Sequence, residues 1–122
     1  MTTRPTATRV LFYVQHLQGI GHVVRGKRIA EALTADGFDV TLVLGGMPIE
    51  GLSLDGAKVV QLPPLRASSR SFRELLTPHG SIADDAYKAR RTAMLCDTAE
   101  HIRPDILLIE AFPFDRPQMH FE

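Results

Sequence analysis

The sequence of 122 residues has one cysteine, no tryptophan and no excess of either charge. Because Cys96 is alone, an internal disulfide and a cysteine-rich zinc site are excluded, and no metal site is indicated. Its place within an expected helix favours inert packing in the core. Fourteen basic and fourteen acidic residues cancel, so no overall positive field attracts the chain to nucleic acid.

Long apolar runs are also missing. The N-terminal stretch MTTRPTATR is positively charged, but the apolar run after it is much shorter than a signal-peptide core or the roughly 20 residues of a membrane span. These absences predict a cytoplasmic protein. The 44% of hydrophobic residues suffices for one core, and the length allows a single domain over residues 1–122, with residues 1–7 as a disordered lead-in.

Apolar periodicity predicts that strands alternate with helices. Four short apolar runs are typical of parallel strands covered on both faces. They are residues 10–15, 38–44, 58–62 and 105–110. Helical spacing extends over residues 22–35, and again from Ser81 up to Pro104, which cannot continue a helix. Residues 65–80 between them lack a pattern, and a connection of that length is usually functional or mobile.

This order of elements predicts an α/β fold. We expect a Rossmann-like, three-layer open parallel sheet with strand order 3-2-1-4 and helices on both faces. The first and fourth strands are then neighbours. Ligands of such sheets bind beyond the carboxyl ends of the strands, where the strand order reverses. The turn after the first strand and Glu110 at the end of the fourth therefore meet at the predicted site.

The apolar positions also predict which helix faces are buried. In the first helix the core-facing residues are Val23, Gly26, Ile29, Ala30 and Leu33. In the second they are Ala83, Ala86, Tyr87, Ala93, Met94 and Ile102. Three basic residues of the second helix are expected on a solvated face, namely Lys88, Arg90 and Arg91.

The turn QGIGHVVRG departs from the common nucleotide fingerprints. A G-x-G-x-x-G motif fails because Val24 stands in place of the third glycine, and the second strand ends in glycines instead of an acidic residue for the ribose. The spacing from Gly21 to Lys27 fits a Walker loop, but Arg28 takes the magnesium-ligand position and the loop would fall inside the helix. The sequence therefore predicts neither a nicotinamide cofactor nor a P-loop hydrolase, and no cofactor is expected.

The glycines of this turn still indicate a binding place. Gly19 and Gly21 allow close backbone approach, and the next helix presents free N–H groups and its positive dipole end to an anion or a hydroxyl group. His22 stands at the start of that helix, where the dipole disfavours a protonated imidazole, so the neutral ring can act as a base. Two alternatives stay open: His22 caps or packs against the helix, or His16 takes the role of base.

The stretch HLQGIGHVVRGKRIAEALTADGFDVTLVLGG resembles the N-terminal signature of GT-B glycosyltransferases. The likeness is greatest to the family of the lipid-linked peptidoglycan N-acetylglucosaminyltransferase, whose glycine-rich first loop ends in histidine. RPDILLIEAFPF is similar to the segment in which an acidic residue ends a strand before an aromatic residue and proline. The resemblance covers residues 10–114. It implies the acceptor-binding N-terminal half of a two-domain enzyme, inactive without a C-terminal domain that holds most of the nucleotide-sugar.

The resemblance also implies roles for residues. His22 would remove the proton from the acceptor hydroxyl, and Glu110, in place of the commoner aspartate, would orient it. Gly19, Ile20 and Gly21 would contact the acceptor, although Ile20 replaces a small residue of the family, which leaves contact with a diphosphate open. A lipid-linked acceptor would add peripheral contact with the inner membrane.

Two further segments are candidates for acceptor binding. A basic group follows the third strand, namely Arg66, Arg70, Arg73 and His79. Guanidinium groups pair with phosphate or carboxylate, which suits an anionic acceptor, and a solvated loop is the alternative. Phe112 and Phe114 could line an acceptor pocket or meet a second domain. The alternative function is a free-standing Rossmann-like or flavodoxin-like module that binds a small anion or a protein partner.

Overall fold

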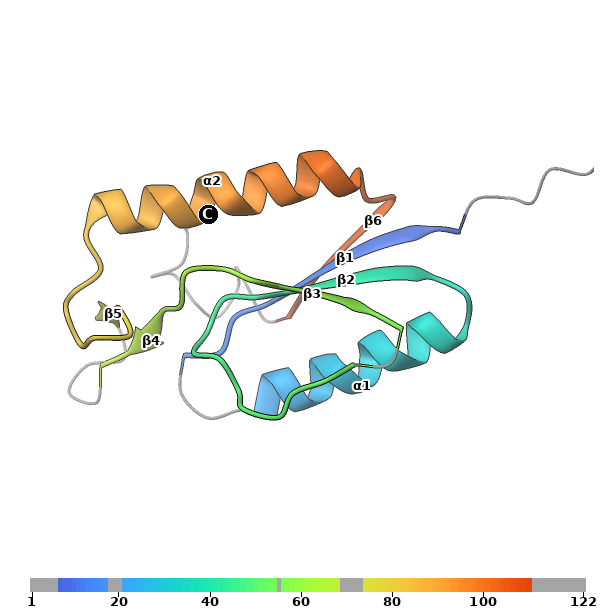
Figure 1. The fold of residues 1–122 in the computed structure, drawn as a ribbon, viewed down its shortest axis with the longest axis horizontal. Coiled ribbons are helices and arrows are strands. Elements are labelled where there is room, and N and C mark those ends of the chain that lie inside the picture. Colours follow the sequence, from blue (N-terminus) through green and yellow to red (C-terminus); the bar gives the residue numbers. More distant parts are fainter. Residues whose placement is uncertain (1–6, 18–20, 55, 69–73, 111–122) are drawn as a thin grey trace, which may run out of the picture.

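The computed structural model describes residues 7–17, 21–54, 56–68 and 74–110. The described residues form six strands and two helices (Figure 1). The elements are β1 (Arg9–Val14), α1 (Gly21–Ala35), β2 (Asp39–Leu44), β3 (Lys58–Gln61), β4 (Arg66–Ala67), β5 (Leu75–Leu76), α2 (Asp85–Ile102) and β6 (Ile106–Glu110). One helix lies between β1 and β2 and the other between β5 and β6. The expected lead-in falls mostly on residues 1–6, which lie outside the described residues.

The main sheet has four parallel strands in the order β3-β2-β1-β6. This confirms the predicted α/β fold and strand order, with β6 as the fourth strand of the pattern. Val14 at the end of β1 is in register with Leu44 of β2 and with Glu110 of β6. The carboxyl ends of these three strands therefore share one edge of the sheet, and α1 and α2 lie on opposite faces of the sheet (Figure 1).

Helix α1 covers one face as its apolar spacing predicts. Val23, Gly26 and Ala30 are buried, and they pack over alternate residues of β1 and β2, such as Phe12 and Leu42. A side chain in place of the Gly26 hydrogen would come within 3.0 Å of a methyl group of Val14. Glycine at this position therefore lets the helix approach the sheet closely.

Helix α2 covers the other face with its second half only. Leu95, Ala99 and Ile102 pack against a cluster that includes Leu11 and Val43 of the sheet. The first half extends past the carboxyl edge, which is visible in Figure 1. The predicted core positions Ala86 and Ala93 lie in this first half and are exposed, so they are wrong, and so is Met94, which is exposed in the second half. Cys96 is exposed as well, so its expected place in the core is also wrong.

The start of α2 is set by its cap. The side chain of Asp84 accepts a hydrogen bond from the backbone N–H of Tyr87, 2.8 Å away, which satisfies one of the free donors of the first turn. The helix therefore begins at Asp85, four residues after the predicted start at Ser81. At the other end Arg103 takes the left-handed conformation before Pro104, as the predicted stop requires.

A small lobe stands beyond the carboxyl edge, in the segment expected to lack secondary structure. Strands β4 and β5 pair antiparallel, and the lobe has its own apolar cluster, made of Leu17, Leu65, Ala67, Leu75 and Ala83. The backbone N–H groups of Ala67 and Leu65 donate to the carbonyls of Leu17 and Gly45. These bonds attach the lobe to the ends of β1 and β2.

Strand β6 forms an edge of the sheet and keeps apolar surface exposed. Leu107 is 58% exposed, and Ile106 and Ile109 are about 40% exposed. A groove of ≈ 190 Å³ separates this strand from α2, with Leu107 and Ile109 on one side and Leu95 and Cys96 on the other. Neither described helix has the length and apolar character needed to cross a bilayer.

Candidate functional site

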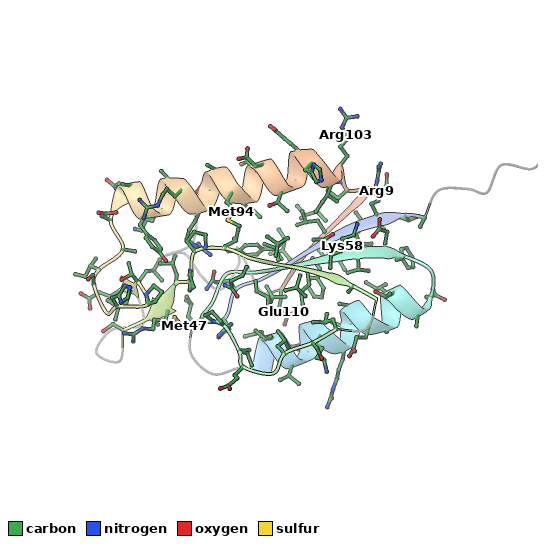
Figure 2. All side chains as sticks on the ribbon, viewed as in Figure 1. Arg9, Met47, Lys58, Met94, Arg103 and Glu110 are labelled. Carbon is green, nitrogen blue, oxygen red and sulfur yellow. The ribbon has the colours of Figure 1, made fainter. Side chains whose placement is uncertain are left out.

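The reversal of strand order brings together two side chains from distant parts of the sequence. Glu110 is the last residue of β6, and His22 is the second residue of α1, the helix that follows the neighbouring strand β1. The His22 Nδ1 atom lies 3.0 Å from Glu110 Oε1. Figure 2 shows Glu110 below the sheet, on the side of α1. The structure thus places the predicted histidine and carboxylate in direct contact.

Arg25 completes this group and was missed in the sequence. Its Nη2 atom lies 2.7 Å from Glu110 Oε1 and 3.3 Å from His22 Nδ1. Residues three apart on a helix are neighbours on its surface, so the first turn of α1 directs both Arg25 and His22 toward the end of β6. The signal that could have identified Arg25 is this spacing from His22, with an acidic residue expected opposite.

The burial of the three side chains differs. Glu110 is 17% exposed, His22 is 30% exposed and Arg25 is 61% exposed. The carboxylate is therefore the most enclosed member, and a cation on its outer side offsets its charge. Within the described residues no hydrogen bond engages His22 Nε2. A ring held at Nδ1 with Nε2 unengaged is the arrangement that a general base requires.

His16, the alternative base, occupies a different setting. It is 7% exposed, and its ring lies against Gly46, where even a Cβ atom would collide with it. Within the described residues, the hydrogen bonds and ion pairs of the Glu110 side chain are with His22 and Arg25. The geometry thus favours His22 over His16 as the residue that a carboxylate orients.

The candidate acceptor-binding residues are only partly placed. Gly21 is exposed, and a Cβ atom there would meet open space, so packing does not require glycine at this position. Arg66 is half-buried on β4, and within the described residues it forms no hydrogen bond or ion pair with His22 or Glu110. His79 is described and lines a cavity. The remaining candidates lie outside the described residues, namely Gly19, Ile20, Arg70, Arg73, Phe112 and Phe114.

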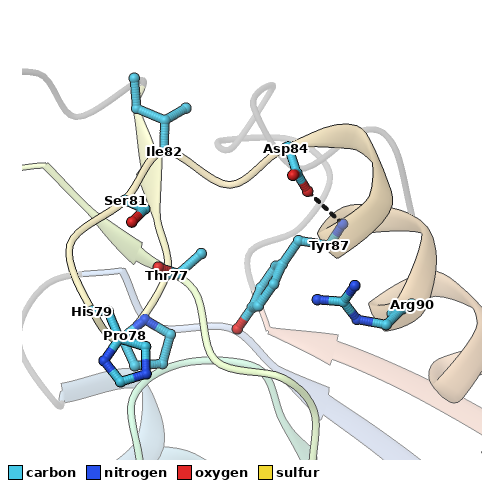
Figure 3. A pocket seen from close by; sticks show the side chains of 8 residues that line it. All are labelled: Thr77, Pro78, His79, Ser81, Ile82, Asp84, Tyr87 and Arg90. Atoms are coloured by element: carbon cyan, nitrogen blue, oxygen red, sulfur yellow. Dashed lines mark hydrogen bonds between the residues drawn. The ribbon is translucent and has the colours of Figure 1, made fainter.

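A polar cavity lies between the small lobe and the first turns of α2 (Figure 3). Its volume is ≈ 410 Å³, and the residues that line it are Thr77, Pro78, His79, Ser81, Ile82, Asp84, Tyr87 and Arg90. The Arg90 guanidinium lies 5.3 Å from the centre of the Tyr87 ring. Burial raises the pKa of the Tyr87 phenol above its usual 10.0, and the charges of Arg91 and Arg90 partly oppose this.

Arg66 of β4 does not line this cavity but lies close to the segment that does. Its Nη2 atom would lie 3.4 Å from a Cβ atom built on Gly80, which stands between the cavity residues His79 and Ser81. One arginine and one histidine thus line a concave surface beyond the carboxyl edge, and Arg66 lies close to the segment that carries the histidine. Arginine pairs well with phosphate and carboxylate groups.

Arg91 does not belong to the solvated face on which it was predicted. It is fully buried, with Nε 2.7 Å from the carbonyl of Pro63 and Nη2 2.8 Å from Gln15 Oε1. The reason is that α2 passes over the ends of β1 and β2, where backbone carbonyls and Gln15 supply acceptors in place of water. Sequence spacing alone could not show this.

The two glycines that follow β2 make room for buried side chains, Gly45 for this network and Gly46 for His16. A Cβ atom on Gly45 would lie 2.0 Å from Gln15 Oε1 and 2.4 Å from Arg91 Nη2. Both distances are far below contact distance, so no larger residue fits. In the sequence these glycines stand where a nucleotide-binding strand would have an acidic residue for the ribose. The structure gives them a packing role.

In the described parts of the chain no three His, Cys, Asp or Glu side chains gather closely enough to hold a metal ion. Comparison of the sequence and structure with family models, with curated proteins and with solved structures gives no match. The chemistry of the site must therefore be argued from its own residues.

Proposed function

We propose that this chain is the acceptor-binding domain of a glycosyltransferase and that His22 is its general base. The observation that carries the proposal is the 3.0 Å contact between His22 Nδ1 and Glu110 Oε1 at the edge where ligands of such sheets bind. The resemblance to the first loop of GT-B enzymes supports the same role. The nucleotide-sugar would be held mainly by a second domain.

The reaction assigns one task to each side chain. A carboxylate only accepts hydrogen bonds, so Glu110 favours a proton on Nδ1 of the neutral His22 ring and leaves the lone pair on Nε2. Nε2 then takes the proton of the acceptor hydroxyl as its oxygen attacks the anomeric carbon of the donor. The bond from that carbon to the nucleoside diphosphate breaks, and the diphosphate leaves with the electron pair. Glu110 stabilises the imidazolium that forms.

The acceptor would extend from His22 along the carboxyl edge toward the small lobe. The cavity there offers hydroxyl groups and the basic side chains of His79 and Arg90, and Arg66 lies close to Gly80 next to it. Such basic groups suit an acceptor with a phosphate or carboxylate group. This assignment keeps the predicted acceptor role of Arg66, although at a distance from the reacting hydroxyl.

The test measures glycosyl transfer by this chain joined to its donor-binding domain. We expect His22→Ala to lower kcat by about a hundredfold or more, because general-base catalysis contributes about that much. The thermal unfolding midpoint should change little. Arg28→Ala is the matched control, since Arg28 is an exposed residue of the same helix, and its kcat should equal that of the wild type.

Two results would count against the proposal. Unchanged turnover in His22→Ala would remove His22 from the role of base. Binding of an anionic compound at the carboxyl edge, without transfer in the joined protein, would instead favour the alternative of a binding module.

A further inference from the structure

A carboxylate beside a histidine has two effects, and only one of them helps a base. It orients the ring by accepting the Nδ1 hydrogen, but its charge also favours a second proton on the imidazole. A doubly protonated ring cannot accept a proton. A base oriented by Glu110 therefore needs something that offsets the charge of the carboxylate.

Arg25 is placed to provide that offset. Its guanidinium lies 2.7 Å from the same oxygen, Oε1, that contacts His22, and 3.3 Å from the imidazole Nδ1. The charged groups that face the ring within the described residues are Glu110 from β6 and Arg25 from α1. The positive dipole end of α1 acts in the same direction as Arg25.

The hydrogen bonds of the three groups are mutually compatible. Arg25 Nη2 carries two hydrogens and donates one of them to Glu110 Oε1 at 2.7 Å. With the proton on Nδ1, His22 donates to the same oxygen. The 3.3 Å approach of Arg25 Nη2 to Nδ1 is then an electrostatic contact and not a hydrogen bond, because a protonated Nδ1 has no lone pair to accept one. A carboxylate oxygen can accept both bonds. The ring thus keeps its orientation while the net charge of its two neighbours is zero.

We propose that Arg25 is a positioning residue that pairs with Glu110 and leaves His22 as a neutral base with Nε2 available. The catalytic consequence rests on the proposed function, whereas the effect on the imidazole can be measured in this chain alone. Arg25 itself takes no part in proton transfer.

The experiment follows the ring signals of His22 by NMR in a pH titration of the 122-residue chain. In Arg25→Ala the carboxylate is unopposed, so the midpoint should rise relative to the wild type. In Glu110→Gln the guanidinium is unopposed, so the midpoint should fall. Arg25→Lys should restore most of the wild-type value, and Arg28→Ala should match the wild type.

Salt provides a second measurement. Arg25 is largely exposed, so concentrated salt screens its charge, and in 1 M NaCl the difference between wild type and Arg25→Ala should shrink. A structural role for Arg25 would instead disperse or broaden backbone signals throughout α1 and would not respond to salt in this way. Arg25→Gln, which keeps a polar side chain without the charge, should behave like Arg25→Ala.

A midpoint that stays constant or falls in both Arg25→Ala and Arg25→Gln would overturn the inference. The joined transferase separates this failure from that of the proposed function. There, Arg25→Ala should move the acidic limb of the profile of kcat/KM against pH upward by the same amount. If the NMR midpoint moves and the rate profile does not, Arg25 controls the imidazole as inferred, and the assignment of His22 as the base falls.

Discussion

Two arginines stand at the carboxyl edge of the sheet in opposite settings. Arg91 of α2 is fully buried and donates to Gln15 and to the carbonyls of Pro63 and Gly45. Arg25 is 61% exposed and pairs with Glu110 beside His22. One edge of one sheet therefore has a closed polar half, at the ends of β1 to β3, and an open polar half, at the ends of β1 and β6.

The difference separates structure from chemistry. In the closed half a buried guanidinium is tolerable because acceptors replace water, namely two backbone carbonyls and the buried side chain of Gln15. In the open half a ring nitrogen has no hydrogen bond within the described residues. We therefore expect changes in the closed half to affect stability, and changes in the open half to affect the titration of His22 and catalysis.

Arg91→Ala should give the largest loss of stability. The substitution removes the hydrogen bonds of a charged donor, leaves its buried acceptors without a partner and opens a cavity. Together these effects lower the free energy of unfolding by on the order of 4 kcal/mol. That is a large part of the stability of a typical domain. Urea unfolding measures the loss. Arg90→Ala, an exposed neighbour on α2, should change stability by less than about 0.5 kcal/mol, and equal losses in the two variants would refute a closed half.

Gly45→Ala should give the next largest loss. The new methyl group would overlap Gln15 Oε1 and Arg91 Nη2, and both side chains are buried and held by hydrogen bonds. Overpacking of this kind costs about 2 to 3 kcal/mol. Gly21→Ala in the open half is the control, because its methyl group would meet no atom within 4 Å. A stable Gly45→Ala protein would show that the network can shift.

The open half could be predicted from the sequence more fully than the closed half. Glu110 and His22 meet because strand order follows from a regular alternation of elements, and both residues stand at element ends that apolar patterns mark clearly. Their contact needed only the topology. Predicting the role of Arg25 requires one more step, because its side chain on the polar face of α1 must be paired with a carboxylate on β6.

The closed half depends on facts that the pattern does not contain. The burial of Arg91 could be predicted only with knowledge of where α2 crosses the sheet. Beyond the sheet, residues at the start of α2 pack against the small lobe instead. Strands of two residues, such as β4 and β5, carry too few positions to show an alternation. The exposure of Ala93 and Met94 could not be predicted from helical spacing either, because it depends on how α2 lies over the sheet.

Tyr87 lies between the two settings and should give the smallest of these effects. Its hydroxyl donates to the carbonyl of Pro64 at 2.7 Å, while its ring lines the open cavity (Figure 3). Tyr87→Phe should therefore cost about 1 kcal/mol near neutral pH. Desolvation raises the pKa of the folded phenol above 10.0, so above that pH the unfolded chain loses its proton first. The stability that Tyr87 contributes is then fully present below about pH 10 and declines as the pH rises through the folded value.

Urea unfolding of wild type and Tyr87→Phe at several pH values tests this sign. The difference between the two proteins should stay constant up to about pH 10 and shrink above it. Titration of tyrosinate absorbance in both proteins assigns the late ionisation to Tyr87, because the variant lacks it. A difference that grows with pH would mean that the phenolate is favoured at this position. In that case the positive charges of Arg90 and Arg91 would outweigh the effect of burial on the Tyr87 pKa. The cavity would then favour a negative charge.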